Sequence, residues 1–423
     1  MPIIAKPIPE PADLPVLKPL FAHADDETFV ALLLESLAKA NECAQNGALD
    51  GALYDALPLP GMDGWPLTLA DYAYYLTVYS RWLPQQSTDA AWTNPSAPSA
   101  FPHEHREVYD RLCWFHWLIN QPLDGLNGGV LQDIAWFADF LVDWANDWGT
   151  FLDTPESFNE TILDTWRKEA PRYQIEDSMI GEPLRPNAPS GWLTFNQFFA
   201  RELNPGLRPI QNLGDNTTVT APADCTYKRH FQIAEDGTIP EIVIKGTHTY
   251  ASVQQLLHGS QYADAFNGGH FIHCFLGPYS YHRFHTPVAG VVQECYPLTG
   301  QVFLDVSLED GQFEAADSAT NGYEFLQARG VLTIDTTGAE AGDIGIVGVL
   351  PIGMCQVSGV NMTHAVGAPC DKGDEFGYFT FGGSDIIILL QEGTNPTWNP
   401  NFTPGTDHYS LYGTEVATVA AQS

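Results

Sequence analysis

The spacing of apolar residues predicts that the first part of the chain is helical. Between residues 130 and 152 an apolar side chain recurs every three or four positions, which would place these side chains on one face of a helix. They are Leu131, Ile134, Ala138, Leu141, Ala145 and Trp148, with acidic and amide residues between them. Because the aromatic residues fall on this apolar face, we expect them to pack in a core rather than to bind an aromatic ligand.

Three further segments fit helices. The acidic residues 25–27 precede an apolar run that starts at Phe29, which is typical of a helix start. Residues 67–83 and 105–119 have the same helical character. A shorter helix should follow Thr194, because Thr194-Phe-Asn-Gln197 fits a capping box and Asn204-Pro205-Gly206 would end the helix.

From about residue 217 the pattern changes to short β-branched and apolar runs separated by Gly, Pro, Asn and Asp, which predicts strands. The expected strands are 217–221, 241–245, 271–275, 290–296, 302–306, 330–335, 344–350 and 386–390. Residues 366–379 are expected to form strand, tight turn and strand. A linker containing Pro and Gly, 181–191, separates the two patterns. The sequence therefore predicts an α+β protein, with a mostly helical N-terminal domain (1–190) followed by a mainly β domain (191–423).

Composition narrows the classes of partner. The chain has 52 acidic and 18 basic residues and a net charge of −34. This balance argues against a nucleic-acid partner, whose phosphates need Lys and Arg, and against tight docking on anionic lipid. The most apolar long stretch, 130–148, is interrupted by four aspartates, so stable membrane insertion is not expected. Seven dispersed cysteines without Cys-x-x-Cys spacing suggest reduced thiols in a cytoplasmic protein, and no signal peptide is recognisable.

The residues Gly382-Gly383-Ser384 stand directly before the last expected strand. Glycine leaves the carbonyl group before Ser384 unhindered and widens the backbone angles available there. The Ser384 hydroxyl could therefore attack the Gly383 carbonyl, which would cleave the Gly383–Ser384 bond and convert Ser384 into a pyruvoyl group. The alternative is a glycine turn or bulge before a buried strand, which is common.

Histidines are the candidate acids and bases for this chemistry. His282 and His285 lie three residues apart before a proline, and histidine titrates near neutral pH. A surface or packed pair is the simpler interpretation. A zinc site would need two more ligands, for which His270 and His273 are weak candidates.

Two other segments could contribute. Asp224 follows a predicted strand and could orient a histidine, as the acid does in a Ser-His-Asp arrangement, or it could serve as a turn residue. The segment 198–210 reads FFARELNPGLRPI, and its residues alone indicate only a helix end and a turn.

Together, five motifs in one order resemble the phosphatidylserine decarboxylase family, across roughly residues 193–395. In this chain they are 198–210, Pro222–Cys225, Tyr281–Pro287, Lys372–Phe379 and Gly382–Ser384. No single motif would be decisive, but five in register are a strong signal. Two positions depart from the family pattern: Cys225 replaces a glycine, and Asp385 replaces the threonine after the cleavage serine. Asp385 adds a carboxylate beside the scissile bond, which puts the rate and pH dependence of cleavage in question.

The resemblance implies roles for the residues in self-processing. Asp224 orients His285, and His285 takes the proton from Ser384 as the serine oxygen attacks the Gly383 carbonyl. An unactivated hydroxyl needs such an adjacent base. Elimination from the resulting ester then leaves a pyruvoyl group at position 384.

The resemblance also implies the mature form. Residues 1–383 become the β chain, and residues 384–423 become the α chain, whose N-terminus is the covalent pyruvoyl cofactor. This cofactor forms a Schiff base with a substrate amine and accepts electrons as CO2 leaves, as pyridoxal phosphate does. His282 then protonates the carbanion. The family suggests no metal, chains that stay associated, and a homodimer.

The N-terminal region bears on the substrate. Residues 144–152 and Val349–Met354 resemble the soluble branch of the family that includes a fungal tryptophan decarboxylase. We therefore expect a free L-amino acid, for example an aromatic one such as tryptophan. The alternative is decarboxylation of phosphatidylserine to phosphatidylethanolamine in phospholipid biosynthesis, which the net negative charge of the chain disfavours.

A hypothesis from another class is a non-processing binding module. Residues 366–379 resemble part of the barrel-sandwich fold shared with lipoyl and biotinyl carriers. A carrier needs a modifiable lysine at an exposed hairpin tip, and Lys372 is the local candidate. It lacks the residues that usually flank such a lysine, and a carrier would have no use for the serine, histidine and aspartate described above.

Overall fold

The computed structural model describes residues 2–5, 7–93, 105–168, 173–178, 191–239, 252–315, 325–356, 359–403 and 408–422. The chain divides into two compact units. The helical unit comprises Met1–Phe198 together with Gln301–Ala316, and the β unit comprises Phe199–Gly300 together with Asp317–Ser423. Most of the predicted linker 181–191 and the whole predicted strand 241–245 lie outside the described residues.

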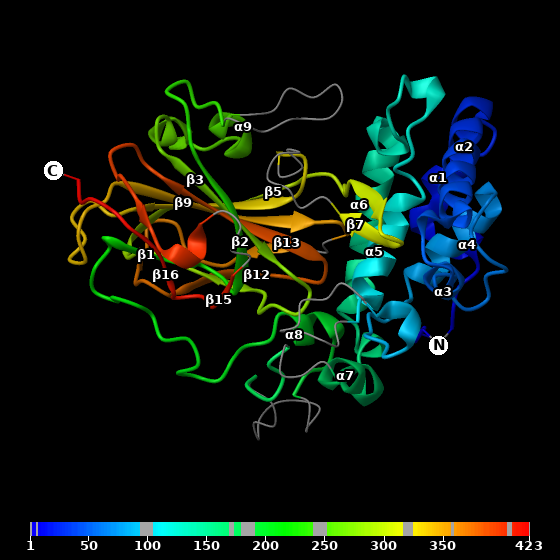
Figure 1. The fold of residues 1–423 in the computed structure, drawn as a ribbon, viewed down its shortest axis with the longest axis horizontal. Coiled ribbons are helices and arrows are strands. Elements are labelled where there is room, and N and C mark those ends of the chain that lie inside the picture. The colour runs from blue at the N-terminus through cyan, green and yellow to red at the C-terminus, as the bar shows by residue number, and fades with distance from the viewer. Residues whose placement is uncertain are drawn as a thin grey trace. The chain divides into compact units, whose positions relative to one another are not determined.

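The helical unit contains the helices that the apolar pattern predicts (Figure 1). Its α-helices are α1 (Lys18–Ala22), α2 (Glu27–Cys43), α3 (Gly51–Ala56), α4 (Leu69–Tyr79), α5 (Glu107–Trp117), α6 (Ala135–Leu152) and α7 (Glu160–Arg167). The Asp26 side chain caps α2 by accepting hydrogen bonds from the backbone N–H groups of Thr28 and Phe29, as the acidic start predicts. Two strands, β6 (Val306–Glu309) and β7 (Gln312–Ala315), pair antiparallel in this unit.

Aromatic side chains form the centre of the helical unit. The Tyr79 ring lies 5.3 Å from Trp82, 5.6 Å from Phe115, 5.4 Å from Trp144 and 5.1 Å from Trp148 between ring centroids. Trp82, Trp144 and Trp148 are fully buried. The aromatic residues of α6 therefore pack in a core, which confirms the interpretation of the apolar face. No described helix combines the length and the apolar character that crossing a membrane requires.

The β unit is built on an eight-stranded antiparallel sheet in the order β11-β5-β8-β9-β13-β3-β2-β15. These strands are β2 (Cys225–Gln232), β3 (His270–Leu276), β5 (Gly290–Leu298), β8 (Arg329–Asp335), β9 (Ile346–Met354), β11 (Pro369–Cys370), β13 (Gly383–Leu390) and β15 (Tyr409–Ser410). Two three-stranded sheets accompany it, in the orders β10-β12-β4 and β1-β16-β14. Their strands are β1 (Thr218–Thr220), β4 (Arg283–His285), β10 (Val360–Met362), β12 (Glu375–Phe379), β14 (Thr397–Trp398) and β16 (Glu415–Thr418). The remaining described α-helices are short: α8 (Phe195–Phe199), most of which belongs to the helical unit, and α9 (Val253–Leu256) of the β unit.

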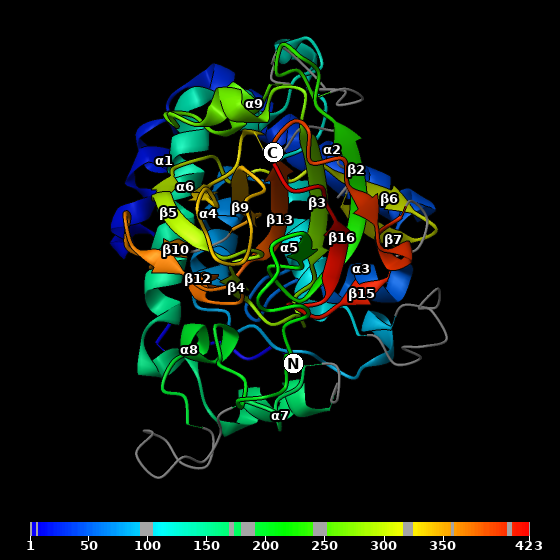
Figure 2. The same ribbon diagram turned by 90° about the vertical axis from the view of Figure 1, so that its left-hand side faces the viewer.

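Strand β13 runs through the middle of the large sheet, between β9 and β3 (Figure 2). Ser384 lies opposite Leu276 and Gly353, and Asp385 lies opposite Phe275 and Ile352. Because side chains alternate along a strand, Ser384 and Asp385 point to opposite faces of the sheet.

The α+β class is thus confirmed, and one local expectation is wrong. Residues 302–305 form no strand, and β6 starts only at Val306. Residues 366–379 form strand, turn and strand as expected, in β11 and β12, although these two strands do not pair with each other. β11 pairs with β5, whereas β12 pairs with β4 and β10. The barrel-sandwich resemblance stays a prediction.

Candidate active site

The predicted cleavage position lies inside the β unit. Ser384 is fully buried, and its Oγ lies 3.4 Å from Nδ1 of His282. Gly382, at the turn into β13, has φ +155°, in the region that favours glycine. The glycines that the sequence places before Ser384 therefore serve the turn that brings the serine to a histidine.

His282 is a neutral imidazole that presents an acceptor to Ser384. Its Nε2 lies 3.3 Å from the Pro278 carbonyl oxygen, which can only accept, so Nε2 carries the hydrogen and Nδ1 has the lone pair. Burial, reinforced by the positive charge of Arg201, lowers the pKa of His282 to about 3. The Phe199 ring stacks on the imidazole at 3.8 Å and 17°. Nδ1 is therefore able to take a proton from the serine hydroxyl.

His285 is held on three sides. Its Nδ1 donates to the Gly373 carbonyl at 2.9 Å, and its Nε2 lies 3.2 Å from the Tyr281 hydroxyl. The Tyr412 ring lies parallel to the imidazole, at 3.8 Å and 3°. Burial lowers the pKa of His285 to about 4, against the opposing effect of the Gly373 hydrogen bond. Both predicted histidines are therefore neutral at neutral pH.

Asp224 is fully buried and is bound by an arginine. Arg208 Nε donates to Asp224 Oδ1 at 3.0 Å, and Arg208 Nη2 donates to Oδ2 at 2.5 Å. Asp224 Oδ1 also accepts the backbone N–H of Tyr412 at 2.8 Å. Tyr412 thus links Asp224 to His285, because its backbone N–H binds Asp224 and its ring covers the imidazole.

Three residues of this site were not singled out from the sequence. Phe199 and Arg208 belong to the segment 198–210, whose chemistry was not evident, and the structure shows that they contact His282 and Asp224. That shared segment was the available signal. Tyr412 stands in none of the five motifs, so no sequence signal pointed to it.

Asp385, one of the two residues that depart from the family pattern, has a partner of its own. Asp385 Oδ2 lies 3.3 Å from Nε2 of His273 on β3, and both side chains are fully buried. In the register of the sheet, His273 lies opposite Ile387, on the same face as Asp385 and opposite to Ser384. The extra carboxylate is therefore paired on the far side of the strand from the cleavage serine.

Two alternative interpretations lose support. The described residues contain no group of three or more His, Cys, Asp or Glu side chains arranged to hold a metal ion. The histidines that were considered as zinc ligands therefore form no such group. Lys372 is 2% exposed, and its Nζ donates to the backbone oxygens of Asn212, Asp215 and Thr218 at 2.8, 2.5 and 2.8 Å. The prediction that Lys372 is an exposed carrier lysine is therefore wrong.

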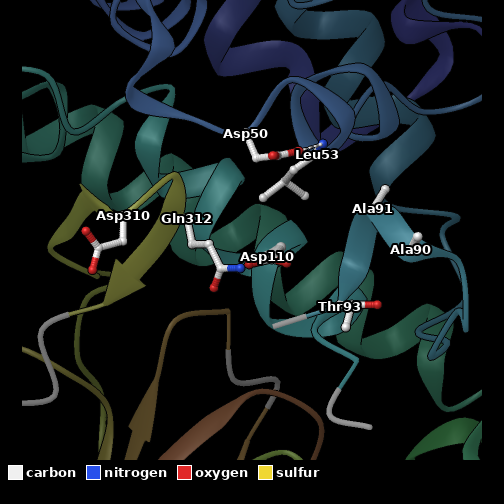
Figure 3. Close-up of a pocket in the computed structure, with 8 residues that line it drawn as sticks. All are labelled: Asp50, Leu53, Ala90, Ala91, Thr93, Asp110, Asp310 and Gln312. Carbon is white, nitrogen blue, oxygen red and sulfur yellow. Dashed lines mark hydrogen bonds between the residues drawn. The ribbon is translucent and has the colours of Figure 1, made fainter. Parts of the chain in front are cut away.

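A separate cavity of about 270 Å³ lies in the helical unit (Figure 3). It is lined by Asp50, Leu53, Ala90, Ala91, Thr93, Asp110, Asp310 and Gln312. Two of its carboxylates have structural partners, because Asp50 caps α3 and Asp110 pairs with Arg106 at 3.4 Å. None of the predicted catalytic residues lines this cavity.

Comparison with known proteins agrees with the geometry. A family model described as phosphatidylserine decarboxylase matches residues 195–411, just over half of the chain. The chain belongs to the phosphatidylserine decarboxylase family. The match spans every residue of the site described above except Tyr412, which follows the last matched residue.

Individual relatives cover parts of the chain. A phosphatidylserine decarboxylase proenzyme 2 of Oryza sativa is 28% identical over 60% of this chain, which spans 37% of the rice protein. A phosphatidylserine decarboxylase proenzyme of Chlamydia felis is 35% identical over 48% of this chain and 62% of the relative. Decarboxylase iboD of Amanita muscaria is 26% identical over 58% of this chain and 74% of the relative. The family thus includes proteins named for phosphatidylserine and one that is not.

Proposed function

We propose that this protein is a self-processing, pyruvoyl-dependent decarboxylase that removes the α-carboxylate of an amino acid as CO2 and leaves the amine. The observation that carries the proposal is the buried Ser384 hydroxyl, 3.4 Å from a lone pair of neutral His282 and directly after two glycines. Membership in a family whose relatives are named decarboxylase proenzymes supports it.

Self-processing follows from the chemistry of the Gly383–Ser384 bond. A base takes the hydroxyl proton, Ser384 Oγ attacks the Gly383 carbonyl carbon, and the C–N bond breaks as the nitrogen gains a proton. The two residues are then joined by an ester. Removal of the Ser384 α proton expels the Gly383 carboxylate. Addition of water and loss of ammonia leave a pyruvoyl group at position 384.

The base in this reaction has two candidates. We assign it to His285, as the family order of motifs implies, and assign to His282 the proton transfer during turnover. This assignment requires Ser384 to exchange its contact with His282 for one with His285. The 3.4 Å contact favours the opposite assignment, in which His282 is the processing base. Cleavage of the His282→Gln and His285→Gln variants separates the two.

The residues around position 384 fit a pyruvoyl group. When formed, it supplies a carbonyl that condenses with the substrate amine and takes up the electrons released as CO2 leaves. The position is fully buried, so water is kept from the reacting atoms. His282 Nδ1 faces it with its lone pair, and we assign to this nitrogen the transfer to the product α-carbon of a proton that the substrate ammonium gives up. The Phe199 ring holds the imidazole in this orientation through its stacking contact.

The two products of cleavage should remain one protein. Strand β13 starts at Gly383 and pairs with both β3 and β9 along its length. Residues 384–423 also supply β14, β15 and β16 to the sheets of the β unit. We therefore expect the α and β chains to stay associated without a covalent link.

For the substrate, we propose a free L-amino acid, with phosphatidylserine as the alternative. The net charge of −34 disfavours docking on anionic lipid. The names of the rice and chlamydial relatives favour phosphatidylserine. We also infer a cytoplasmic location, because no disulfide joins the seven cysteines.

A denaturing gel and a product assay test the proposal. Purified wild-type protein should run as two chains, and Ser384→Ala as one. The cleaved protein should then release an amine from one member of a panel of L-amino acids or from phosphatidylserine vesicles, detected by mass spectrometry. Wild-type protein that stays intact, or that cleaves but releases no amine from any of these substrates, contradicts the proposed function.

A further inference from the structure

Tyr412 stands between the two residues that are predicted to act as an acid–histidine pair. Its backbone N–H donates to Asp224 Oδ1 at 2.8 Å, and its ring lies 3.8 Å from His285 at an angle of 3°. The carboxylate is fixed from the other side by Arg208, through hydrogen bonds of 2.5 to 3.2 Å. The backbone of Tyr412, from which its ring extends to His285, is therefore held by a buried ion pair.

The remaining contacts leave His285 little freedom. The Gly373 carbonyl and the Tyr281 hydroxyl fix the plane of the ring through its two nitrogens. The Tyr412 ring covers one face of the imidazole, and His285 is only 6% exposed. A parallel aromatic contact of this kind favours one ring orientation and excludes water from that face.

We propose that Tyr412 is a positioning residue for self-processing, which transmits the fixed position of Asp224 to His285 by stacking on its imidazole. This inference rests on the proposed function of His285 as the processing base. It assigns to Tyr412 the part that a direct carboxylate–histidine hydrogen bond has in a Ser-His-Asp arrangement. Because Tyr412 lies in the segment 384–423, the part of the uncleaved chain that becomes the α chain would complete a site whose histidine and aspartate lie before the cleaved bond.

The charges around His285 determine how the inference can be measured. Arg283 lies on the same strand as His285. Glu375 of β12 lies opposite His285 in the register of the sheet, and its carboxylate accepts a hydrogen bond from Arg283 at 2.6 Å. Arg208 and Asp224 lie behind Tyr412, and Tyr281 contacts the ring directly.

Burial is the main cause of the low pKa of His285, about 4, and both nearby arginines lower it further. Replacing the Tyr412 ring with a smaller side chain admits water, which favours the charged imidazole, so the pKa of His285 should rise toward 6.5. A base acts only in its neutral form, above its pKa. Loss of the ring should therefore move the acidic limb of the processing rate to higher pH.

The experiment compares Tyr412→Phe, which keeps the ring, with Tyr412→Leu and Tyr412→Met, which remove it. All three keep the backbone N–H that Asp224 accepts. The matched control is Trp398→Leu, because Trp398 stacks on another histidine of the β unit, His230, at 4.2 Å and 17°. Circular dichroism identifies any variant that does not fold, and a folded Leu or Met variant is sufficient.

Two readouts are taken. The pKa of His285 is measured by NMR on the uncleaved Ser384→Ala background with labelled histidine, and the resonance is assigned from its absence in His285→Gln. The rate of cleavage is measured from pH 4 to 8 in proteins with Ser384 intact.

We expect Tyr412→Phe and Trp398→Leu to match the wild type, and Tyr412→Leu or Tyr412→Met to raise both the pKa of His285 and the pH of the acidic limb. An unchanged pKa and an unchanged limb in the folded Leu and Met variants would overturn the role of Tyr412. If the wild type does not cleave at any pH, the proposed function fails, and the NMR titration alone decides whether Tyr412 positions His285.

Discussion

The buried pair Asp385–His273, next to the proposed cleavage site, gives the sharpest test of how buried polar contacts contribute to the free energy of unfolding. The side chains of Asp385 and His273 are both fully buried, and Asp385 Oδ2 lies 3.3 Å from His273 Nε2. Removing one partner of a buried hydrogen-bonded pair leaves the other unsatisfied and costs about 1–3 kcal/mol, more for a charged group, whereas replacing both partners is often nearly neutral. His273→Val should therefore lower the free energy of unfolding by about 1–3 kcal/mol. Adding Asp385→Thr, the family's residue, should recover most of this loss.

The assay is urea unfolding in the Ser384→Ala background, which keeps every variant uncleaved. A double-mutant cycle over the two positions gives the coupling free energy directly. His270→Val is the matched control, because His270 lies on the same strand, is half-buried, and stacks edge-on with Trp398 at 6.1 Å. The reasoning is refuted if His273→Val lowers the free energy of unfolding by no more than His270→Val does. It is also refuted if the double variant is less stable than His273→Val alone.

Three further predictions concern the site and its support. Arg208→Lys should slow cleavage on a gel time course by at least about tenfold, because lysine cannot reproduce the bidentate grip on Asp224; wild-type kinetics would contradict this role. Lys372→Met should lower the urea midpoint of unfolding, because three backbone oxygens lose their donor, at about 1–3 kcal/mol for each unsatisfied group; an unchanged midpoint would show that water replaces the ammonium. Burial lowers the pKa of His282 to about 3, so His282 is neutral above that pH. The rate of amine release should therefore show no decrease near pH 6.5 that depends on His282. A decrease at pH 6.5 that does depend on His282 would contradict its burial.

The sequence predicted the parts of this molecule that local patterns encode. The apolar face of 130–152 becomes α6, and the run 386–390 becomes the central strand β13. The motif order also brought Ser384 and His282, which are far apart in the chain, into one hypothesis, and they lie 3.4 Å apart.

What the sequence did not predict depends on long-range packing. Strands β11 and β12 are neighbours in sequence, but each finds a partner in a different sheet, because hydrogen-bond register is decided by distant strands. Tyr412 reaches His285 from more than a hundred residues away, and nothing in its local sequence marks it. The partner of Asp385 is likewise a histidine from another strand, which had been considered only as a zinc ligand.

The central claim is that Ser384 becomes the cofactor, and the intact mass of the denatured wild-type protein tests it most directly. We predict two masses, which correspond to residues 1–383 and 384–423. The smaller should be lighter than the same segment with an N-terminal serine by the mass of one ammonia molecule. A single mass for the full 423-residue chain, or a small chain that starts with unmodified serine, would contradict the account.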